Sequence, residues 1–559
     1  MAFLAHDIWF STLALAASGI TAVFWLLCGG IRLRRTPLDG WLALFLLTAV
    51  SGWWIAANSV WAAAKLGVLL AAALGYYLAA GLPRQRLWLA AGVLSGATAV
   101  VAVYFLLAHD WQSWPTDVAL LTRLGLRWMA IRPFTDLPAV HPNKVGGLLA
   151  AFLPLLAVTA GYAVRQRRWP GAAVVGMAAA LSLLALLMSS SRGAWLALLG
   201  GVALSGVVGM LAGRGVKRPL LLLGVGTAVL LSGAFLLTSA GQLAGGDLSR
   251  ILLARQALHL IADYPFTGGG LVSFGPLYSQ YVRVIPFFFF SYAHNLYLDV
   301  WLEQGPLALL SFLGLMGGAL ALLLRPAAAD EEDGLPLLRL GALAGMLTLL
   351  LHGWVDDALY GAWGAPQLLL FAGLAVALSP QAEGAGGTTS WRRWLFVGVS
   401  VVGVGTAVIF HRPLLSAWYA NWGAVQMARV ELAGWPTGHW DDGALARQVD
   451  TGPFLRALAW DEANGVALYR LGLVALGRWE FETAVNYLQA AHLLRPDHRG
   501  VMKSLGYGYV WMGEYDQASS LLQQIPEARS ELEAYGWWWG QQGQRELALH
   551  AETMASRLR

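Results

Sequence analysis

The fold class of this chain is decided by residues 169–213, which read WPGAAVVGMAAALSLLALLMSSSRGAWLALLGGVALSGVVGMLAG. Two long apolar runs lie on either side of a short polar step that ends in Arg192. A helix of about 20 apolar residues spans the hydrocarbon core of a bilayer, and it satisfies its own backbone polar groups there. This stretch therefore predicts two consecutive membrane-spanning helices joined by a tight turn.

The composition of the whole chain has the same character. Of its 559 residues, 57% are hydrophobic and 12% are charged, whereas about a quarter are charged in soluble domains. Mean hydropathy is +0.57. The net charge is only +5, and the arginines lie in short loops rather than on one basic face, so no nucleic-acid partner is expected. The single cysteine, Cys28, excludes a disulfide within the chain. We predict an all-α polytopic membrane protein.

Apolar runs of sufficient length predict about twelve membrane-spanning helices. They lie near residues 8–28, 38–55, 60–80, 87–108, 145–164, 170–189, 193–213, 219–239, 295–324, 336–355, 359–379 and 393–411. Basic residues gather in alternate loops, at Arg32, Arg34, Arg35, Arg84, Arg86, Arg165, Arg167, Arg168, Arg214, Lys217, Arg218, Arg325, Arg339, Arg392 and Arg393. By the positive-inside rule these loops are cytoplasmic, and both ends of the chain lie outside. No Lys or Arg precedes Arg32, so we expect a retained first helix rather than a cleaved signal peptide.

The last part of the chain differs from the membrane part, residues 1–411. Residues 412–465 form a connector that is rich in tryptophan, and residues 466–559 have no long apolar run. Within this tail, residues 467–496 and 501–525 align at an offset of 34, so that Gly472 matches Gly506. This is the tetratricopeptide period, and it predicts an α-solenoid of stacked helix pairs that lies outside the cytoplasm. Such repeats bind protein partners or serve as a structural cap.

Candidate functional residues lie on the predicted outer face, where two long loops cover about residues 109–144 and 240–294. Arg192 stands in the first turn of a helix, Arg250 begins an amphipathic stretch, and His294 precedes a long apolar run. Arginine forks suit phosphate oxygens, and histidine exchanges a proton near neutral pH. These three residues together predict a site for a lipid-linked diphosphate.

Each of these residues also has a simpler interpretation. Arg192 could extend to lipid headgroups, Arg250 could be a solvated charge on an interfacial helix, and His294 could be an ordinary helix-start histidine. Asp299 and Glu303 follow His294 on the same helix, where they could orient it or make polar contacts between helices.

The order of these motifs resembles that of the O-antigen ligase and polymerase superfamily of membrane glycosyltransferases. The resemblance covers about residues 140–320. It is carried by these elements: His141-Pro142-Asn143, Ser191-Arg192-Gly193, Arg250 leading into Asp263-Tyr264-Pro265-Phe266-Thr267-Gly268-Gly269-Gly270, His294-Asn295-Leu296-Tyr297-Leu298 and Glu303-Gln304-Gly305. The triple glycine departs from the Gly-Val-Gly or Gly-Leu-Gly usual in the family, which affects the expected shape of that loop.

The resemblance implies a ligase-like core over about residues 140–380, in a multi-helix fold of the type called GT-C. It implies a bacterial inner-membrane enzyme that acts in lipopolysaccharide and other surface polysaccharide biosynthesis, without a metal or cofactor. Arg192 and Arg250 would contact the diphosphate of an undecaprenyl-linked glycan donor, and His294 would activate the acceptor hydroxyl. Further substrate contacts are expected from Asn143, Arg255, Asn295, Asp299 and Glu303.

The acceptor stays open at this level. A ligase would use a lipid, a polymerase another lipid-linked glycan, and a protein O-oligosaccharyltransferase a Ser or Thr hydroxyl. A transporter or flippase of lipid-linked glycan would also need outward cations, but it predicts internal repeats, and the two halves of the membrane part show no clear similarity. A scaffold whose repeats alone function would leave Arg192, Arg250 and His294 without a role.

Overall fold

The computed structural model describes most of the chain. The described residues are 35–116, 118–135, 137–243, 250–282, 292–325, 334–357, 360–361, 365–379, 405–406, 408–433 and 447–558. All regular elements among them are helices, as predicted. The predicted span 8–28 lies outside these residues, and so does most of the span 393–411.

Seven helices of the described part are long and apolar enough to cross a membrane. They are α3 (Ser59–Ala80), α4 (Leu87–Ala108) with the short η1 (Arg84–Arg86) before it, α6 (Pro142–Arg165), α7 (Trp169–Met188), α8 (Arg192–Gly213), α13 (Pro306–Leu323) and α14 (Leu335–His352). Shorter apolar segments occur in α2 (Asp39–Ile55) and in the first part of α9 (Arg218–Leu243). Most of the predicted spans therefore recur, with boundaries within a few residues.

Two predicted spans are broken in the structure. The expectation of one helix over residues 295–324 is wrong, because α12 (Leu296–Gln304) ends before Gly305 and α13 begins at Pro306. Gly305 has φ +85°, a left-handed conformation that favours glycine, and Pro306 has no N–H with which to continue α12. The predicted span 359–379 contains two short helices, α15 (Ala365–Leu368) and α16 (Leu370–Leu378).

Helix α14 lies at the centre of the membrane part and packs against both α6 and α8. Small residues allow this close packing. A side chain at Gly201 in α8 would place its Cβ 2.3 Å from Thr348 Oγ1, and one at Gly345 would place it 2.5 Å from the carbonyl oxygen of Ala151 in α6. Glycine at such positions lets apolar helices approach and gain dispersion contacts where no water is present to drive association.

Arginines from several loops meet at one end of this bundle, which we call the arginine end. Arg325 Nη1 donates to Ser379 Oγ at 3.1 Å, and Arg339 Nη2 donates to the Leu378 carbonyl at 2.9 Å. Arg84 reaches the Ser379 carbonyl, and Arg218 reaches that of Ala321. Cations at the carboxyl ends of helices are favourable. The loops that charge patterning assigns to the cytoplasm therefore meet at the same end.

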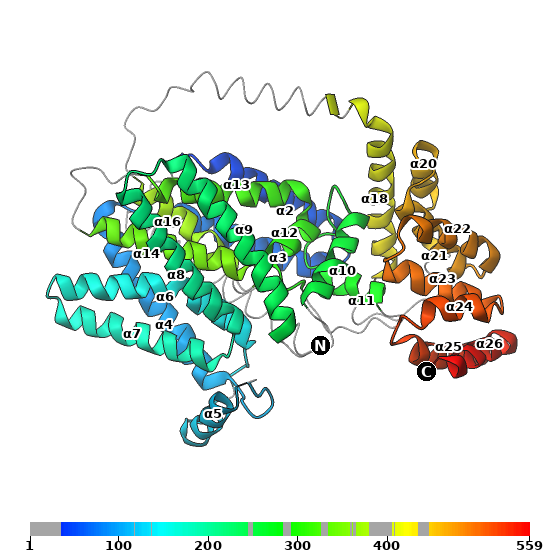
Figure 1. Ribbon diagram of the computed structural model, residues 1–559, viewed down its shortest axis with the longest axis horizontal. Helices are drawn as coiled ribbons and strands as arrows, with labels where there is room; N and C mark the ends of the chain where they lie inside the picture. The colour runs from blue at the N-terminus through cyan, green and yellow to red at the C-terminus, as the bar shows by residue number, and fades with distance from the viewer. Residues whose placement is uncertain are drawn as a thin grey trace.

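Three further helices, α5 (Ala119–Ile131), α10 (Arg250–Asp263) and α11 (Phe274–Val282), lie in the two long loops. The connector begins with α18 (His411–Glu431), whose Arg429 donates to the carbonyl of Trp54 at the end of α2. Figure 1 shows α18 and the helices that follow it beside α10 and α11, at one end of the bundle. The carboxyl end of α2 lies at this end of the bundle. The tail therefore lies at the end opposite the arginine end.

The tail is a stack of helices with its own hydrophobic core. The helices are α20 (Gly452–Trp460), α21 (Gly465–Gly477), α22 (Phe481–Leu494), α23 (Arg499–Trp511), α24 (Tyr515–Leu522), α25 (Ala528–Gln541) and α26 (Arg545–Arg557). The helices α21 and α23 begin at Gly465 and Arg499, which reproduces the predicted 34-residue period.

Equivalent glycines make equivalent contacts in the two repeats. A Cβ at Gly472 would lie 2.6 Å from Leu488 Cγ, and one at Gly506 would lie 2.6 Å from Leu522 Cδ2. The paired helices therefore approach each other in the same way in both units. The tetratricopeptide assignment itself stays a prediction.

A buried histidine in the tail predicts sensitivity to acid. His498 caps α23 by accepting a hydrogen bond from the Val501 N–H at Nδ1, and burial lowers its pKa from 6.5 to about 3. A lowered folded-state pKa means that the unfolded chain binds the proton first. We expect stability to fall by up to about 1.4 kcal/mol per pH unit between pH 6.5 and 3, and not above pH 6.5.

The measurement is the thermal midpoint of the purified full-length protein at pH 7.5, 6.0 and 5.0. The His498→Asn variant is the control, because asparagine also caps helices but does not titrate. Its midpoint should fall less steeply with pH than that of the wild type. Equal slopes would contradict the prediction.

Candidate functional site

The start of α12 is tied to the end of α14, and this junction holds the predicted histidine. The Leu296 N–H donates to the Gly353 carbonyl at 2.7 Å, and Asn295 Nδ2 donates to the Trp354 carbonyl at 3.1 Å. Asn295 Oδ1 also accepts from the N–H groups of Tyr297 and Leu298, so it caps α12. Asn295 is therefore needed to place the turn before it.

The amino ends of α8 and α6 lie near the same junction between α12 and α14. Gly193, next to Arg192 at the start of α8, faces Val355, since a Cβ there would lie 2.8 Å from Val355 Cγ2. Gly146 in the first turns of α6 faces Ser191 just as closely, since a Cβ at Gly146 would lie 2.7 Å from Ser191 Cβ. The amino ends of α6, α8 and α12 thus meet around the segment that follows α14. Helix amino ends carry partial positive charge and exposed N–H donors, so this arrangement favours an anionic ligand.

His294 adopts a left-handed backbone conformation with φ +53° and is mostly buried. Its Nδ1 lies 3.8 Å from Asp356 Oδ1, and its ring centroid lies 4.3 Å from that of Tyr292. The turn is held by Asp299, whose Oδ1 accepts a hydrogen bond of 2.7 Å from the Ala293 N–H. A non-glycine residue in this conformation is strained and persists only where its surroundings require it.

The polar groups around His294 include one buried cation and two carboxylates that sequence reasoning missed. Lys144 Nζ lies 5.0 Å from the Tyr292 ring centroid, and both Lys144 Nζ and Asp357 Oδ1 lie beside Gly361. Burial raises the pKa of Asp357 to about 7, with Lys144 opposing this shift and Asp356 reinforcing it. The signal for these residues was their ionisable character at the ends of apolar runs, beside Asn143 and after the span 336–355.

The triple glycine packs against the end of α12 and the turn between α2 and α3. Gly268 and Gly270 have φ of +70° and +99°. A Cβ at Gly268 would lie 2.5 Å from the Leu302 carbonyl oxygen, and one at Gly270 would lie 2.6 Å from Ala56 Cα. The Gly269 N–H donates to the same Leu302 carbonyl at 2.6 Å. Only glycine fits at the two outer positions, so the loop supports α12 through its backbone.

Glu303 lies in a buried polar network at the end of α12. Lys65 Nζ is 2.7 Å from Glu303 Oε2, the Tyr360 hydroxyl donates to the same oxygen at 2.9 Å, and the Val272 N–H donates to Oε1 at 3.1 Å. Gln304 Nε2 extends the network by donating to the Tyr360 hydroxyl. These contacts hold α3, α12 and the glycine loop together, and they favour a structural role for Glu303 over the predicted contact with substrate.

The remaining predicted residues are spread over the same end of the bundle. Asn143 is partly buried in the first turn of α6, where its N–H donates to His141 Nδ1 at 3.3 Å. Arg255 lies exposed on α10. Arg250 begins α10, but its side chain lies outside the described part of the structure. His294, Asn295, Asp299 and the Arg192 step thus converge, whereas Arg255 lies on α10 and Glu303 lies at the carboxyl end of α12.

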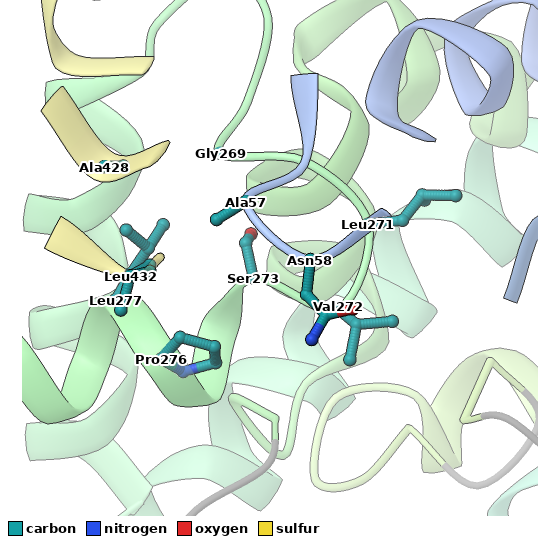
Figure 2. Close-up of a pocket in the computed structure, with 10 residues that line it drawn as sticks. All are labelled: Ala57, Asn58, Gly269, Leu271, Val272, Ser273, Pro276, Leu277, Ala428 and Leu432. Atoms are coloured by element: carbon teal, nitrogen blue, oxygen red, sulfur yellow. The ribbon is translucent and has the colours of Figure 1, made fainter. Parts of the chain in front are cut away.

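A small pocket lies beside the glycine loop. Figure 2 shows its lining, which comes from the α2–α3 turn, the glycine loop, α11 and α18. The lining residues are mostly apolar, with Asn58 and Ser273 as the polar groups. Among the described residues, no group of three or more His, Cys, Asp and Glu is placed to hold a metal ion.

Comparison with known families gives a match within the membrane part. Residues 177–313 match the family model Wzy_C, described as O-Antigen ligase. This stretch is therefore similar to the O-antigen ligase family. The match includes Arg192, Arg250, the glycine loop and His294, so the predicted resemblance is confirmed for this region. The match supports an O-antigen ligase-like, multi-pass membrane enzyme that acts in surface polysaccharide biosynthesis. No curated protein and no solved structure matches the chain.

The packing of the glycine loop predicts an unequal effect of two alanine substitutions. Gly268→Ala combines a positive φ with overlap on the Leu302 carbonyl, whereas Gly543→Ala has a similar φ of +74° with open space around it. Positive φ alone costs about 1–2 kcal/mol. We expect Gly268→Ala to lower the thermal midpoint of the purified full-length protein clearly more than Gly543→Ala. Equal losses would show that the loop has room to move.

Proposed function

We propose that the protein transfers a glycan from an undecaprenyl diphosphate-linked donor to an acceptor hydroxyl at the outer face of the bacterial inner membrane, without a metal or cofactor. The observation that carries this proposal is the meeting of three helix amino ends and the Arg192 step beside a histidine with a carboxylate partner. The match to the O-antigen ligase family supports the same reaction class.

The anionic part of the donor is a diphosphate, which suits the positive end of this site. Arg192 follows the helix start of α8, and Lys144 is buried in the first turn of α6. Buried cations and helix amino ends stabilise the negative charge that develops on a leaving diphosphate. Arg250 is proposed to join them from the start of α10. In this proposal the protein itself supplies the positive charge that a metal ion provides in other diphosphate chemistry.

The base in this reaction is proposed to be His294. With Nδ1 turned to Asp356, Nε2 is the nitrogen that would take the acceptor proton. The acceptor oxygen then attacks the anomeric carbon, and the bond from that carbon to the diphosphate oxygen breaks. Its electron pair leaves with undecaprenyl diphosphate, and the proton on His294 passes to solvent. A positioned base of this kind contributes about 10²–10⁴-fold to the rate.

The acceptor is proposed to be a lipid, as in an O-antigen ligase. A second lipid-linked glycan or a Ser or Thr hydroxyl of a protein would be reached by the same chemistry. A tail on the same end of the bundle as the site favours an acceptor or partner of macromolecular size. A transporter would instead move the donor without making a glycosidic bond, so mass spectrometry of the products separates these functions.

We expect His294→Ala, Arg192→Ala and Arg250→Ala each to lower glycan transfer by at least about 100-fold, because they remove the base or the charge on the leaving group. The assay uses purified protein, lipid-linked donor and candidate acceptors. The controls His411→Ala and Arg545→Ala change exposed residues of the same types and should keep full activity. Wild-type activity in His294→Ala would remove the base from the proposal.

Asp356→Asn tests the partner of the histidine separately. It keeps the shape of the side chain but removes the charge 3.8 Å from His294 Nδ1. We expect transfer to fall by about 10-fold or more, but less than in His294→Ala, because the base is kept while its orientation is weakened. The matched control is Asp461→Asn, a half-buried carboxylate at the end of α20 in the tail. No loss in Asp356→Asn would show that His294 works without this carboxylate.

The orientation in the membrane is proposed from the charge pattern, with the arginine end in the cytoplasm and the tail outside. A Glu533→Cys variant places a thiol on the exposed surface of α25, in a background where Cys28 is replaced by alanine. We expect an impermeant thiol reagent to label it in spheroplasts. Labelling only after the membrane is broken would place the tail, and with it the site, in the cytoplasm.

A further inference from the structure

The tail is joined to the membrane part by a buried ion-pair cluster at the end of α10. Asp263 is fully buried, and two arginines of the tail pair with it: Arg470 Nη2 is 3.0 Å from Oδ2, and Arg495 Nη1 is 2.6 Å from Oδ1. Arg495 also reaches the His259 carbonyl one turn earlier in α10. Burial raises the pKa of Asp263, but Arg495 and Arg470 outweigh it and lower that pKa to about 2. The buried carboxylate is therefore charged, and the two arginines of the tail compensate its charge.

The connector helix α18 contacts the residues that follow Asp263. Asn421 Oδ1 accepts hydrogen bonds from the N–H groups of Phe266 and Thr267 at 3.0 and 3.4 Å, and Asn421 Nδ2 donates to Thr267 Oγ1 at 2.8 Å. The ring of Trp418 lies against that of Phe266, with centroids 5.7 Å apart. The tail and α18 thus hold one face of residues 263–267.

The other face of the same segment supports α12. The Phe266 carbonyl oxygen packs so closely on Gly305 that a Cβ there would lie 2.4 Å away. Further along the loop, the Gly269 N–H donates a hydrogen bond to the Leu302 carbonyl, and the Val272 N–H donates one to Glu303 Oε1. Residues 263–273 therefore form a layer between the tail and the carboxyl end of α12, and the amino end of α12 carries His294.

We propose that Asp263 is a positioning residue, and that the tail and α18 clamp residues 263–273 against α12 so that His294 is held at the site. The repeats are then part of the enzyme rather than a separate binding module. This inference rests on the proposed transferase function for its catalytic readout. Its structural consequence, a loosened 263–273 segment when the clamp is broken, does not depend on that function.

The test compares three variants of the full-length purified protein. Asp263→Asn removes the charge that the two arginines share, and Asn421→Leu removes the hydrogen bonds of α18 to residues 266 and 267. The matched control is Glu531→Gln, which removes the charge that pairs with Lys503 at 2.6 Å, a buried ion pair between two helices of the tail. Each is assayed for thermal midpoint, hydrogen exchange, and kcat and KM for the lipid-linked donor.

We expect Asp263→Asn and Asn421→Leu to lower kcat per folded molecule by about 10-fold or more, because small displacements of a catalytic group have effects of this size. The KM for donor should change less than kcat, and hydrogen exchange should rise in residues 263–273 and 293–304. Glu531→Gln should lower the thermal midpoint but leave kcat and exchange in those residues unchanged.

Unchanged kcat and exchange in both clamp variants would overturn the inference, and so would an equal loss of kcat in Glu531→Gln. If the wild type transfers no glycan at all, the proposed function fails instead. Hydrogen exchange still decides whether the clamp holds residues 263–273.

Discussion

The buried pair between Lys65 and Glu303 is the interaction on which the rest of the site depends. A charged group taken out of water costs several kcal/mol unless a partner compensates it. Lys65 comes from α3 and Glu303 from the end of α12, at 2.7 Å, and Tyr360 and the Val272 N–H complete the coordination of the carboxylate. This pair therefore fixes α12 against α3 and the glycine loop. With its carboxyl end fixed, α12 can hold His294 at its amino end.

The site proposed to bind an anion also depends on elements that meet at one place. The segment after His352 contacts the starts of α8 and α12, and the start of α6 packs on Ser191 just before α8. Each start adds partial positive charge and N–H donors, and Arg192 and Lys144 add full charges nearby. The carboxylates Asp356 and Asp357 keep this cluster from being purely cationic. A site built in this way suits the proposed diphosphate and also retains a partner for the histidine.

Much of the fold could be predicted from local sequence, because a membrane requires long apolar helices wherever the chain crosses it. The spans α3, α6, α7, α8 and α14 and the 34-residue period of the tail follow from patterning alone. The break at Gly305 was missed, since apolar residues continue through it, although the Gly305-Pro306 pair was a signal. Asp356, Lys144 and the clamp on Asp263 were also missed, because their partners lie far away in the sequence.

The sequence by itself determined the class of the protein, the order of its motifs and the period of its repeats, because these depend on composition and on contacts within one turn of helix. Only the tertiary structure decided which partners the charged groups have. It pairs Glu303 with Lys65, places the Ala293 N–H on Asp299 and brings Asp356 within 3.8 Å of His294. The tertiary structure also shows that the tail is joined to α10 through Asp263, Arg470 and Arg495. Buried charges take their role from the partners that packing brings within a few ångströms, and no local pattern records those partners.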